Sequence, residues 1–222
     1  MIKVELDEEL LRASPRTALG CVTAQVNTCA SPGDLGRELQ ECTEKILKLP
    51  EPKSVLESAA IEATRRAYKA LGKDPARYRG SAEALIRRVI AGKGLPRINN
   101  VVDIINLVSV ESRLPIGLYD LDRVHGDIHF RAGRAGETYK GIGKYDLNLE
   151  GLPVFCDEAG PHGSPTSDSE RTMVTEQTKR VVGILISFGG PQGLDGWTKR
   201  MAELLQKYAQ GAEVETRVVD AA

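Results

Sequence analysis

The chain has 222 residues, a mass of 24.1 kDa and a formal net charge of −1 at pH 7. This length predicts one large domain or one domain with appendages, and 41% hydrophobic with 27% charged residues is typical of a soluble globular protein. The small net charge excludes a general attraction to phosphate backbones, so binding to nucleic acid would require a local basic patch.

The sequence shows no sign of a membrane span or a secretory signal. No run approaches the roughly 18–20 consecutive apolar residues that a membrane helix needs. The first ten residues, MIKVELDEEL, lack the charged-then-apolar pattern of a signal peptide, so we expect a cytoplasmic location.

Neither the cysteines nor the histidines have the spacing of a metal site. The four cysteines lack any CxxC pair, which argues against a zinc knuckle or a redox pair and predicts free thiols, with a catalytic cysteine as the alternative. His125 and His129 have no third ligand at a matching distance. We therefore expect no metal and no other cofactor.

The first hundred residues predict two strands followed by three helices. Residues 2–6 and 17–26 are short and rich in β-branched side chains, as strands are. Residues 34–48 repeat apolar side chains at helical spacing behind Asp34, a candidate N-cap. A second helix is expected over 53–71, closed by Gly72, and a third begins at Ser81 and ends at Gly92 or Gly94.

The run from 98 to 120, INNVVDIINLVSVESRLPIGLYD, mixes apolar and polar side chains in a helical pattern. On a helix over 99–111, Asn99, Asp103 and Asn106 fall within roughly 60° of one another, at spacing i, i+4, i+7. Apolar side chains cover almost all of the remaining surface. The pattern predicts a largely buried helix with one polar seam, which either forms a structural network or lines a pocket.

The second half of the chain changes character. Short apolar runs near 127–132, 152–156, 171–175 and 181–188 are separated by Gly, Pro, Ser and Asp, which predicts strands of an antiparallel sheet. Residues 195–208 place apolar side chains on one helical stripe. Helices first and strands after favour an α+β fold over regular βαβ winding.

The helical run also carries a family motif. It resembles the B3/B4 domain of the bacterial phenylalanyl-tRNA synthetase beta subunit, whose signature has the form R-x-I-N-N-V-V-D-[IV]-[TS]-N-[YL]-V and then Q-P-[LI]-H-A-[FY]-D-L-D. Arg97 to Val108 match the first half except at Ile105, and Pro115 and 119–122 match in the second. The similarity continues more weakly through RAGRAGETY, VFCDEAGP and VTEQTKRVV, over roughly residues 80–190.

This resemblance implies a layered β/β/α fold with an N-terminal helical portion, within an α+β class. We expect a single B3/B4-like domain over 1–222, with an N-terminal portion (1–80), the core (80–190) and a C-terminal helix and tail (191–222). The whole chain looks like the stand-alone B3/B4 proteins.

The resemblance also implies tRNA or aminoacyl-tRNA as the ligand and ester hydrolysis as the reaction, because the synthetase domain removes tyrosine wrongly esterified to phenylalanine tRNA. Three positions depart from the family's editing set: Gly117 replaces a histidine, Ile105 a threonine, and Ile184 aligns loosely with the glutamate that reads the tyrosine hydroxyl. Asn106 is retained. An apolar replacement gives up discrimination for a hydroxyl, so we expect the edited amino acid not to be tyrosine.

Residues 157–171, DEAGPHGSPTSDSER, concentrate polar side chains among glycines and prolines. This composition predicts a shaped, exposed loop, and the resemblance puts it beside the editing pocket. Backbone N–H groups at Gly163 and Ser164 are candidates to hold an oxyanion or carboxylate, Asp168 to orient a water, and Arg171 to bind an anion. The spacing of His162, Ser164 and Asp168 is too short for a triad, and a plain solvated connection is the alternative.

The working hypothesis is a freestanding aminoacyl-tRNA deacylase, and whether the site is active is open. Its candidate catalytic residues are Asn106, Asp168 and Ser169. Candidate substrate-binding residues are Asn99, Asp103, Gly117, Tyr119, Gly163, Ser164 and Arg171. Arg79, Arg87 and Arg88, within a basic stretch over 65–97, are candidates for RNA binding. The alternatives are a non-catalytic RNA-binding module and a small-molecule binder.

Overall fold

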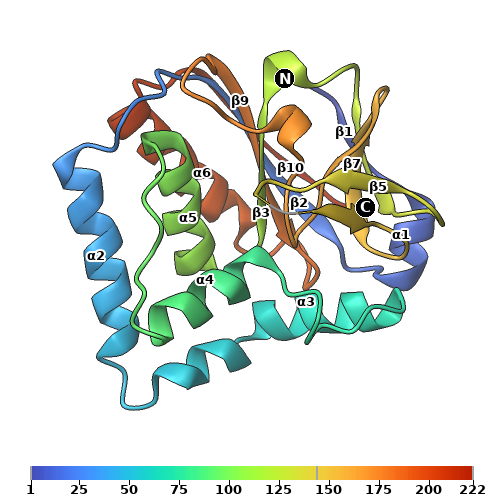
Figure 1. The fold of residues 1–222 in the computed structure, drawn as a ribbon, viewed down its shortest axis with the longest axis horizontal. Helices are drawn as coiled ribbons and strands as arrows, with labels where there is room; N and C mark the ends of the chain where they lie inside the picture. Colours follow the sequence, from blue (N-terminus) through green and yellow to red (C-terminus); the bar gives the residue numbers. More distant parts are fainter. Residues whose placement is uncertain (1, 144, 222) are drawn as a thin grey trace.

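The computed structural model describes residues 2–143 and 145–221, which form two packed sheets and a layer of helices (Figure 1). The first sheet has the order β1 (Val4–Leu6), β4 (Ile128–Ala132), β7 (Pro153–Asp157) and β8 (Gly160–Gly163). The second has the order β10 (Ala212–Val219), β2 (Ala18–Gln25), β9 (Arg180–Ser187) and β3 (Ile116–Asp120). Strands from the first 25 residues thus enter both sheets.

Each face of the second sheet packs on a different partner. One face meets the first sheet through a core that contains Tyr119, Ile184, Phe130 and Phe155. The opposite face carries Leu118 and other side chains that pack on the helices. The order of layers is therefore sheet, sheet, helices, and the expected α+β fold with β/β/α layering is confirmed.

The helical layer consists of α2 (Gly33–Leu47), α4 (Ser81–Ile90), α5 (Asn100–Ser112) and α6 (Leu194–Ala209), which pack against one another over the second sheet (Figure 1). Two further helices lie at the ends of the sheets: α1 (Glu8–Ala13) beside β4, and α3 (Ala59–Ala70) beside β9. The hairpin of β5 (Thr138–Lys140) and β6 (Asp146–Asn148) lies next to β8. Short 3-10 turns occur at Pro52–Glu57, Leu121–Arg123 and Glu170–Thr172. None of the described helices is long and apolar enough to cross a membrane.

Helix α5 is the central buried helix, and its start explains the polar residues of the family motif. The Asn99 side chain caps it by accepting a hydrogen bond from the Val102 N–H, at 2.9 Å. The Asn100 amide donates to the carbonyls of Asn27 and Tyr208 and accepts from the Cys29 N–H. These bonds attach the helix to two segments far away in the sequence.

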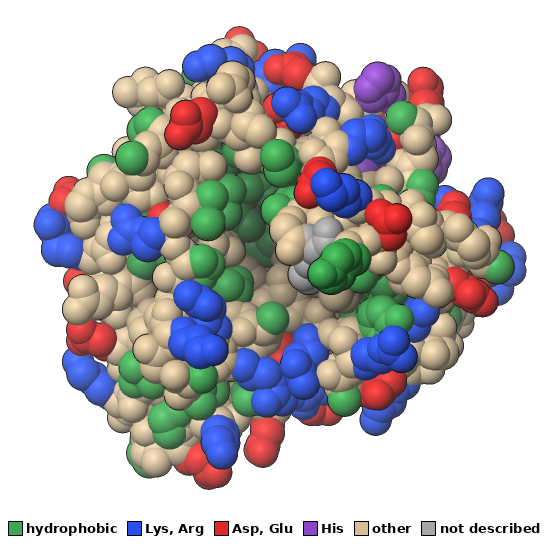
Figure 2. Space-filling model, viewed as in Figure 1, with side chains coloured by type: hydrophobic (Ala, Val, Ile, Leu, Met, Phe, Trp, Pro, Cys, Tyr) green, Lys and Arg blue, Asp and Glu red, His purple; other side chains and the backbone are tan. Residues whose placement is uncertain are grey.

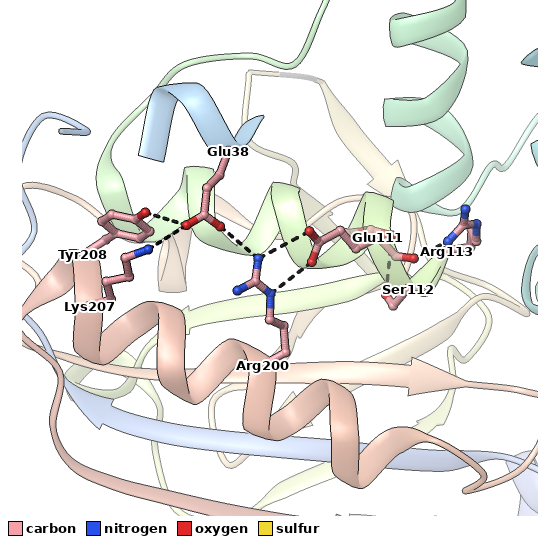
Figure 3. Close-up of polar contacts among 8 residues, drawn as sticks. Glu38, Glu111, Ser112, Arg113, Arg200, Lys207 and Tyr208 are labelled. Carbon is pink, nitrogen blue, oxygen red and sulfur yellow. Dashed lines mark hydrogen bonds and ion pairs between the residues drawn. The ribbon is translucent and has the colours of Figure 1, made fainter. Parts of the chain in front are cut away.

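A chain of charged groups joins three of the helices (Figure 3). The Arg200 guanidinium of α6 donates to Glu38 of α2 at 2.9 Å and to Glu111 of α5 at 3.2 Å. Glu38 also accepts from the Lys207 ammonium and the Tyr208 hydroxyl. The network lies along a groove of about 660 Å³ between α2, α5 and the start of α6.

Several local predictions were wrong. Helix α2 is capped at Pro32 rather than Asp34, and α4 at Gly80 rather than Ser81. The helix expected over 53–71 is divided at Ser58, whose extended backbone separates a 3-10 turn from α3. Residues 171–175 form the end of a 3-10 turn and a loop instead of a strand.

The remaining helices and most strands agree with the sequence pattern. The helices expected over 99–111 and 195–208, and the strands near 127–132, 152–156 and 181–188, are all present. In the first sheet β4, β7 and β8 run antiparallel as expected, whereas β1 joins β4 in parallel.

Candidate functional site

The surface is hollowed near the centre of the view in Figure 2, where Figure 1 draws β3 between α5 and the β5–β6 hairpin. Hydrophobic side chains line the walls of this hollow, and Lys and Arg side chains gather below it. Because β3 is the outer strand of the second sheet, its free edge is open to side chains from other segments.

The Asp168 carboxylate binds at this free edge of β3. One carboxylate oxygen accepts the backbone N–H of Leu118 at 3.3 Å, and the other accepts the Tyr119 hydroxyl at 3.0 Å. The Leu118 side chain packs in the helical layer, on the face of the sheet opposite to the Tyr119 ring. Asp168 itself is half-buried, and both of its carboxylate oxygens are bonded to β3.

Tyr119 is fully buried, and two glycines make room for its ring. A Cβ atom at Gly117 or at Gly163 would lie 2.1 Å from the Tyr119 hydroxyl oxygen. The ring also meets the His162 ring edge-on, with centroids 4.4 Å apart, and the Phe155 ring at 5.7 Å. Gly117 and Gly163, both expected to contact substrate, thus have their α-carbons against the Tyr119 phenol.

The loop over 164–169 is held by two more tyrosine hydroxyls. Tyr68 of α3 shares a hydrogen bond with the Thr166 hydroxyl at 2.8 Å, and Tyr139 of β5 donates to the Ser167 carbonyl at 2.5 Å. The expectation that this polar segment is an exposed loop was wrong, because Ser164, Pro165 and Ser169 are buried and the residues between them are half-buried. The hydroxyls of Tyr68 and Tyr139 satisfy polar groups of this loop that water would satisfy in an exposed turn.

Two polar side chains, one just before this loop and one at its end, have no hydrogen-bond partner among the described residues. Both ring nitrogens of His162 and the Ser169 hydroxyl are buried and unpaired. Burial is the main reason that the pKa of His162 is lowered; Arg171 lowers it further, and Asp157 acts in the opposite direction. His162 is therefore a neutral imidazole inside the core at neutral pH.

Arg171 and Ser164 have their polar groups engaged within the protein. The Arg171 guanidinium forms a two-pronged pair with the Asp157 carboxylate, at 2.8 and 3.0 Å, and also donates to the Gly160 carbonyl. The Ser164 hydroxyl donates to the Ser167 carbonyl and accepts the Ser167 N–H. Such groups shape the loop but would have to give up these bonds to bind a ligand.

The predicted polar seam of α5 divides into two parts. Asn99 is the helix cap, and the fully buried Asp103 accepts bonds from Ser31, Arg97 and the Ile98 N–H. Asn106 is half-buried on the same helical side as Ser109, whose hydroxyl donates to the Leu114 carbonyl just before β3. The Ser109 bond ties the second half of α5 to the segment that leads into β3, while Asn99 and Asp103 lie at the helix start.

The three arginines expected to contact RNA are all exposed. Arg79 precedes α4, and Arg87 and Arg88 lie in its last turn. Arg87 donates to the buried Glu83 carboxylate at 2.8 Å, which Arg65 also binds. The structure thus presents three exposed cations around one helix, partly balanced by a buried acid.

The sequence reasoning missed two of the tyrosines that hold the 164–169 loop. Tyr68 and Tyr139 carry no motif, and their contacts join residues 98 and 28 positions apart. In the part of the chain that the structure describes, no group of three or more His, Cys, Asp or Glu side chains is placed to hold a metal ion. His129 lies on the exposed side of β4 beside Glu5.

Comparison with known proteins gives this arrangement of sheets and loop a family. Residues 63–190 match the sequence model of the B3/4 domain. The chain belongs to the B3/4 domain family. That stretch contains α5, β3, the 164–169 loop and β9, and with them Asn106, Tyr119 and Asp168.

The relatives of this B3/4 domain protein are much longer proteins. The phenylalanine–tRNA ligase beta subunit of Bartonella quintana (strain Toulouse) is 29% identical over 105 residues, which are 46% of this chain and 13% of that protein. The corresponding subunit of Bartonella henselae is 33% identical over 91 residues, 40% of this chain and 11% of that protein. The chain therefore matches only a small part of each relative.

A solved structure supports the same fold. The crystal structure of an N-terminal fragment of the phenylalanyl-tRNA synthetase beta subunit from Pyrococcus horikoshii aligns with a TM-score of 0.51 and 17% identity. The alignment covers 96% of this chain and 50% of that fragment. At this identity the match concerns the arrangement of the B3/4 fold alone.

Proposed function

We propose that this B3/4 domain protein binds tRNA and hydrolyses the ester of a mischarged aminoacyl-tRNA, which is a trans-editing reaction. The observation that carries the proposal is the half-buried Asp168, whose carboxylate is fixed at the free edge of β3 by the Leu118 N–H and the Tyr119 hydroxyl. The family relationship to the beta subunits of phenylalanine–tRNA ligases supports tRNA as the class of partner.

The reaction requires little of the protein. A water oxygen forms a bond to the acyl carbon, and the bond from that carbon to the ribose oxygen breaks. One water proton passes to the ribose oxygen, and the other remains with the released carboxyl group, which ionises into solvent. A positioned water and a pocket that holds the ester are sufficient, because the aminoacyl ester is already activated. In this proposal Asp168 orients the water, and Asn106 contributes to the polar wall of the pocket. The Ser169 hydroxyl is buried and takes no direct part.

The tRNA backbone would meet Arg79, Arg87 and Arg88 at α4. These cations are exposed, and Lys and Arg side chains also gather below the hollow in Figure 2. Electrostatic contacts of this kind weaken as salt rises, because binding releases counterions from the RNA. A chain with a net charge near zero needs such a local patch.

The amino acid that is removed should not be tyrosine. Ile184 and Gly117 are paired on β9 and β3, and both face the core between the sheets, where the Tyr119 phenol occupies the space beside Gly117. Neither can donate a side-chain hydrogen bond to a phenolic hydroxyl. A pocket without such a group discriminates poorly for that hydroxyl.

The test is deacylation of a panel of mischarged tRNAs by the purified protein. We expect release of at least one amino acid other than tyrosine, and a loss of at least tenfold in rate for Asp168→Asn with tRNA affinity kept. Efficient clearance of tyrosine from phenylalanine tRNA would contradict the specificity, and no turnover of any ester would contradict the reaction.

A non-catalytic RNA-binding module is the second candidate. It is favoured by one observation: Gly117 supplies no side chain at the edge of the site, and its α-carbon faces Tyr119 instead of a ligand. Salt-dependent tRNA binding without turnover in the same panel would support this alternative.

A further inference from the structure

Three tyrosine hydroxyls from three separate elements bind three consecutive residues of the 164–169 loop. Tyr68 of α3 binds Thr166, Tyr139 of β5 binds Ser167, and Tyr119 of β3 binds Asp168. Tyr68 and Tyr119 are completely buried, and Tyr139 is 9% exposed. Three consecutive residues of the loop are thus each held by a buried tyrosine.

The three bonds differ in the atom that they reach. Tyr139 donates to a backbone carbonyl, and Tyr68 meets the hydroxyl of Thr166, so these two hold the course of the loop. Tyr119 donates to the carboxylate of Asp168 and thereby sets the direction of an ionisable side chain. Of the three tyrosines, Tyr119 is the one that binds the group used in the proposed reaction.

The surroundings of Tyr119 keep its hydroxyl protonated and able to donate its hydrogen bond to Asp168. Burial, and after it the neighbouring negative charge of Asp168, raises the pKa of Tyr119 well above its ordinary value. Its ring cannot easily turn away, because Gly117, Gly163, His162 and Phe155 surround it. A hydroxyl that keeps its proton and its place fixes one carboxylate oxygen while the Leu118 N–H holds the other.

We propose that Tyr119 is the positioning residue of the site: its hydroxyl, through Asp168, orients the carboxylate for attack of water on the ester. This inference rests on the proposed deacylase function, and goes beyond it by assigning the reaction geometry to a side chain that does not touch the substrate.

The experiment compares Tyr119→Phe with two matched controls, Tyr139→Phe and Tyr68→Phe, in the full chain. Each variant removes one hydroxyl from the same loop and keeps the ring. For the ester that wild-type protein hydrolyses best, we expect Tyr119→Phe to lower kcat about 10- to 100-fold, the usual cost of removing a group that orients another side chain, with KM within about twofold. The two controls should keep kcat within about threefold.

A double mutant separates positioning from loosening of the loop. If Tyr119 acts through Asp168, Tyr119→Phe with Asp168→Asn should be no slower than Asp168→Asn alone. An additive loss, or equal losses of kcat in all three Tyr→Phe variants, would overturn the inference and indicate a purely structural role.

The two levels of failure are distinguishable. If wild-type protein turns over an ester and Tyr119→Phe matches it in kcat, the positioning role is wrong and the deacylase function stands. If wild-type protein hydrolyses none of the panel, the proposed function and this inference both fail.

Discussion

The α-carbon of Gly117 lies directly against the phenol of Tyr119, two residues later on the same strand. A Cβ atom at position 117 would lie 2.1 Å from the Tyr119 hydroxyl oxygen and 2.7 Å from the ring carbon that bears it. Any residue larger than glycine at 117 would therefore clash with the Tyr119 phenol in its present position.

Gly117→Ala should destabilise the protein by about 1–3 kcal/mol, the usual cost of overpacking a core. Adding Tyr119→Phe should recover part of the loss, because the hydroxyl oxygen is the nearest atom. Thermal or urea unfolding measures both variants.

The control is Gly196→Ala on the exposed side of α6, where a Cβ atom meets nothing within 4 Å. This substitution should be neutral or stabilising by about 0.5–1 kcal/mol. Wild-type stability for Gly117→Ala would contradict the argument.

Glu38→Gln should destabilise the protein at neutral pH and much less at pH 3. Partial burial raises the pKa of Glu38, but hydrogen bonds from Tyr208, Lys207 and Arg200 outweigh it and lower the pKa to about 2. A carboxylate with a lowered pKa stabilises the fold above its ordinary pKa, and this contribution is lost as pH falls toward the lowered value. At pH 7 we expect a loss of about 1–2 kcal/mol, from charge-assisted hydrogen bonds that a neutral amide cannot match.

Chemical unfolding of both proteins at pH 7 and pH 3 measures this difference. Glu41→Gln, an exposed carboxylate on the same helix, serves as the control and should change stability by less than about 0.5 kcal/mol. An equal effect of Glu38→Gln at the two pH values would show that its charge contributes nothing.

His162 should make the fold less stable as pH falls from 7 toward 5. Burial lowers the pKa of His162 in the folded protein. Below the ordinary histidine pKa of about 6.5, the unfolded chain therefore binds a proton at this position that the folded chain does not bind. Stability is therefore unaffected at high pH and declines between the ordinary and the lowered pKa. Asp157 opposes this and Arg171 adds to it.

His162→Phe should remove this pH dependence, because among the described residues neither ring nitrogen has a hydrogen-bond partner to lose. The edge contact with Tyr119 also suits a phenyl ring. The melting temperature at pH 7 and at pH 5 gives the result. His129→Gln, on the exposed side of β4, is the control for loss of a histidine outside the core. A His162→Phe protein that loses stability as steeply as the wild type would place the titrating group elsewhere.

Asp103→Asn should cost about 2–4 kcal/mol of stability. The carboxylate is fully buried and accepts three hydrogen bonds, from Ser31, Arg97 and the Ile98 N–H, and an amide would turn a donor toward one of them. Equilibrium unfolding in urea is the measurement. Asp195→Asn, exposed in the first turn of α6, should cost much less, and a similar loss for both would refute the role of burial.

Replacing Arg79, Arg87 and Arg88 together by Ala should weaken tRNA binding and flatten its salt dependence. If the three side chains meet phosphates, the slope of log affinity against log salt should fall by about 2 to 3. Arg12→Ala on α1, which pairs only with a neighbouring glutamate among the described contacts, is the control. An unchanged slope in the triple variant would move the RNA contact away from α4.

The sequence pattern found the helices better than the strands, for a physical reason. Helix α5 has many apolar positions and one polar side, so its period of 3.6 is visible over thirteen residues. Strand β3, IGLYD, is buried on both faces and shows no alternation, because one face meets the helices and the other meets the first sheet. Strand β10 was missed for the opposite reason, since most of its side chains are exposed.

For the candidate site, the residue types were visible and their partners were not. Asp168 stands out in a polar segment, and its family context made it a candidate. That it is held by Tyr119 depends on a contact across 49 positions, and on two glycines that look like ordinary turn residues in the sequence. Side-chain contacts between distant elements have no local signature, which is also why the loop appeared exposed.

Strand β2 lies between β10 and β9 in the second sheet, so the part of the chain that folds as a unit extends beyond the part that matches the family. The family match covers residues 63–190, whereas β2 spans Ala18–Gln25 and forms the continuous ladder between β9 and β10. A fragment cut at the family limits would leave the whole β9 edge on that side without a neighbour, an open template for aggregation. Expression for biochemistry or crystallisation should therefore begin upstream of β2.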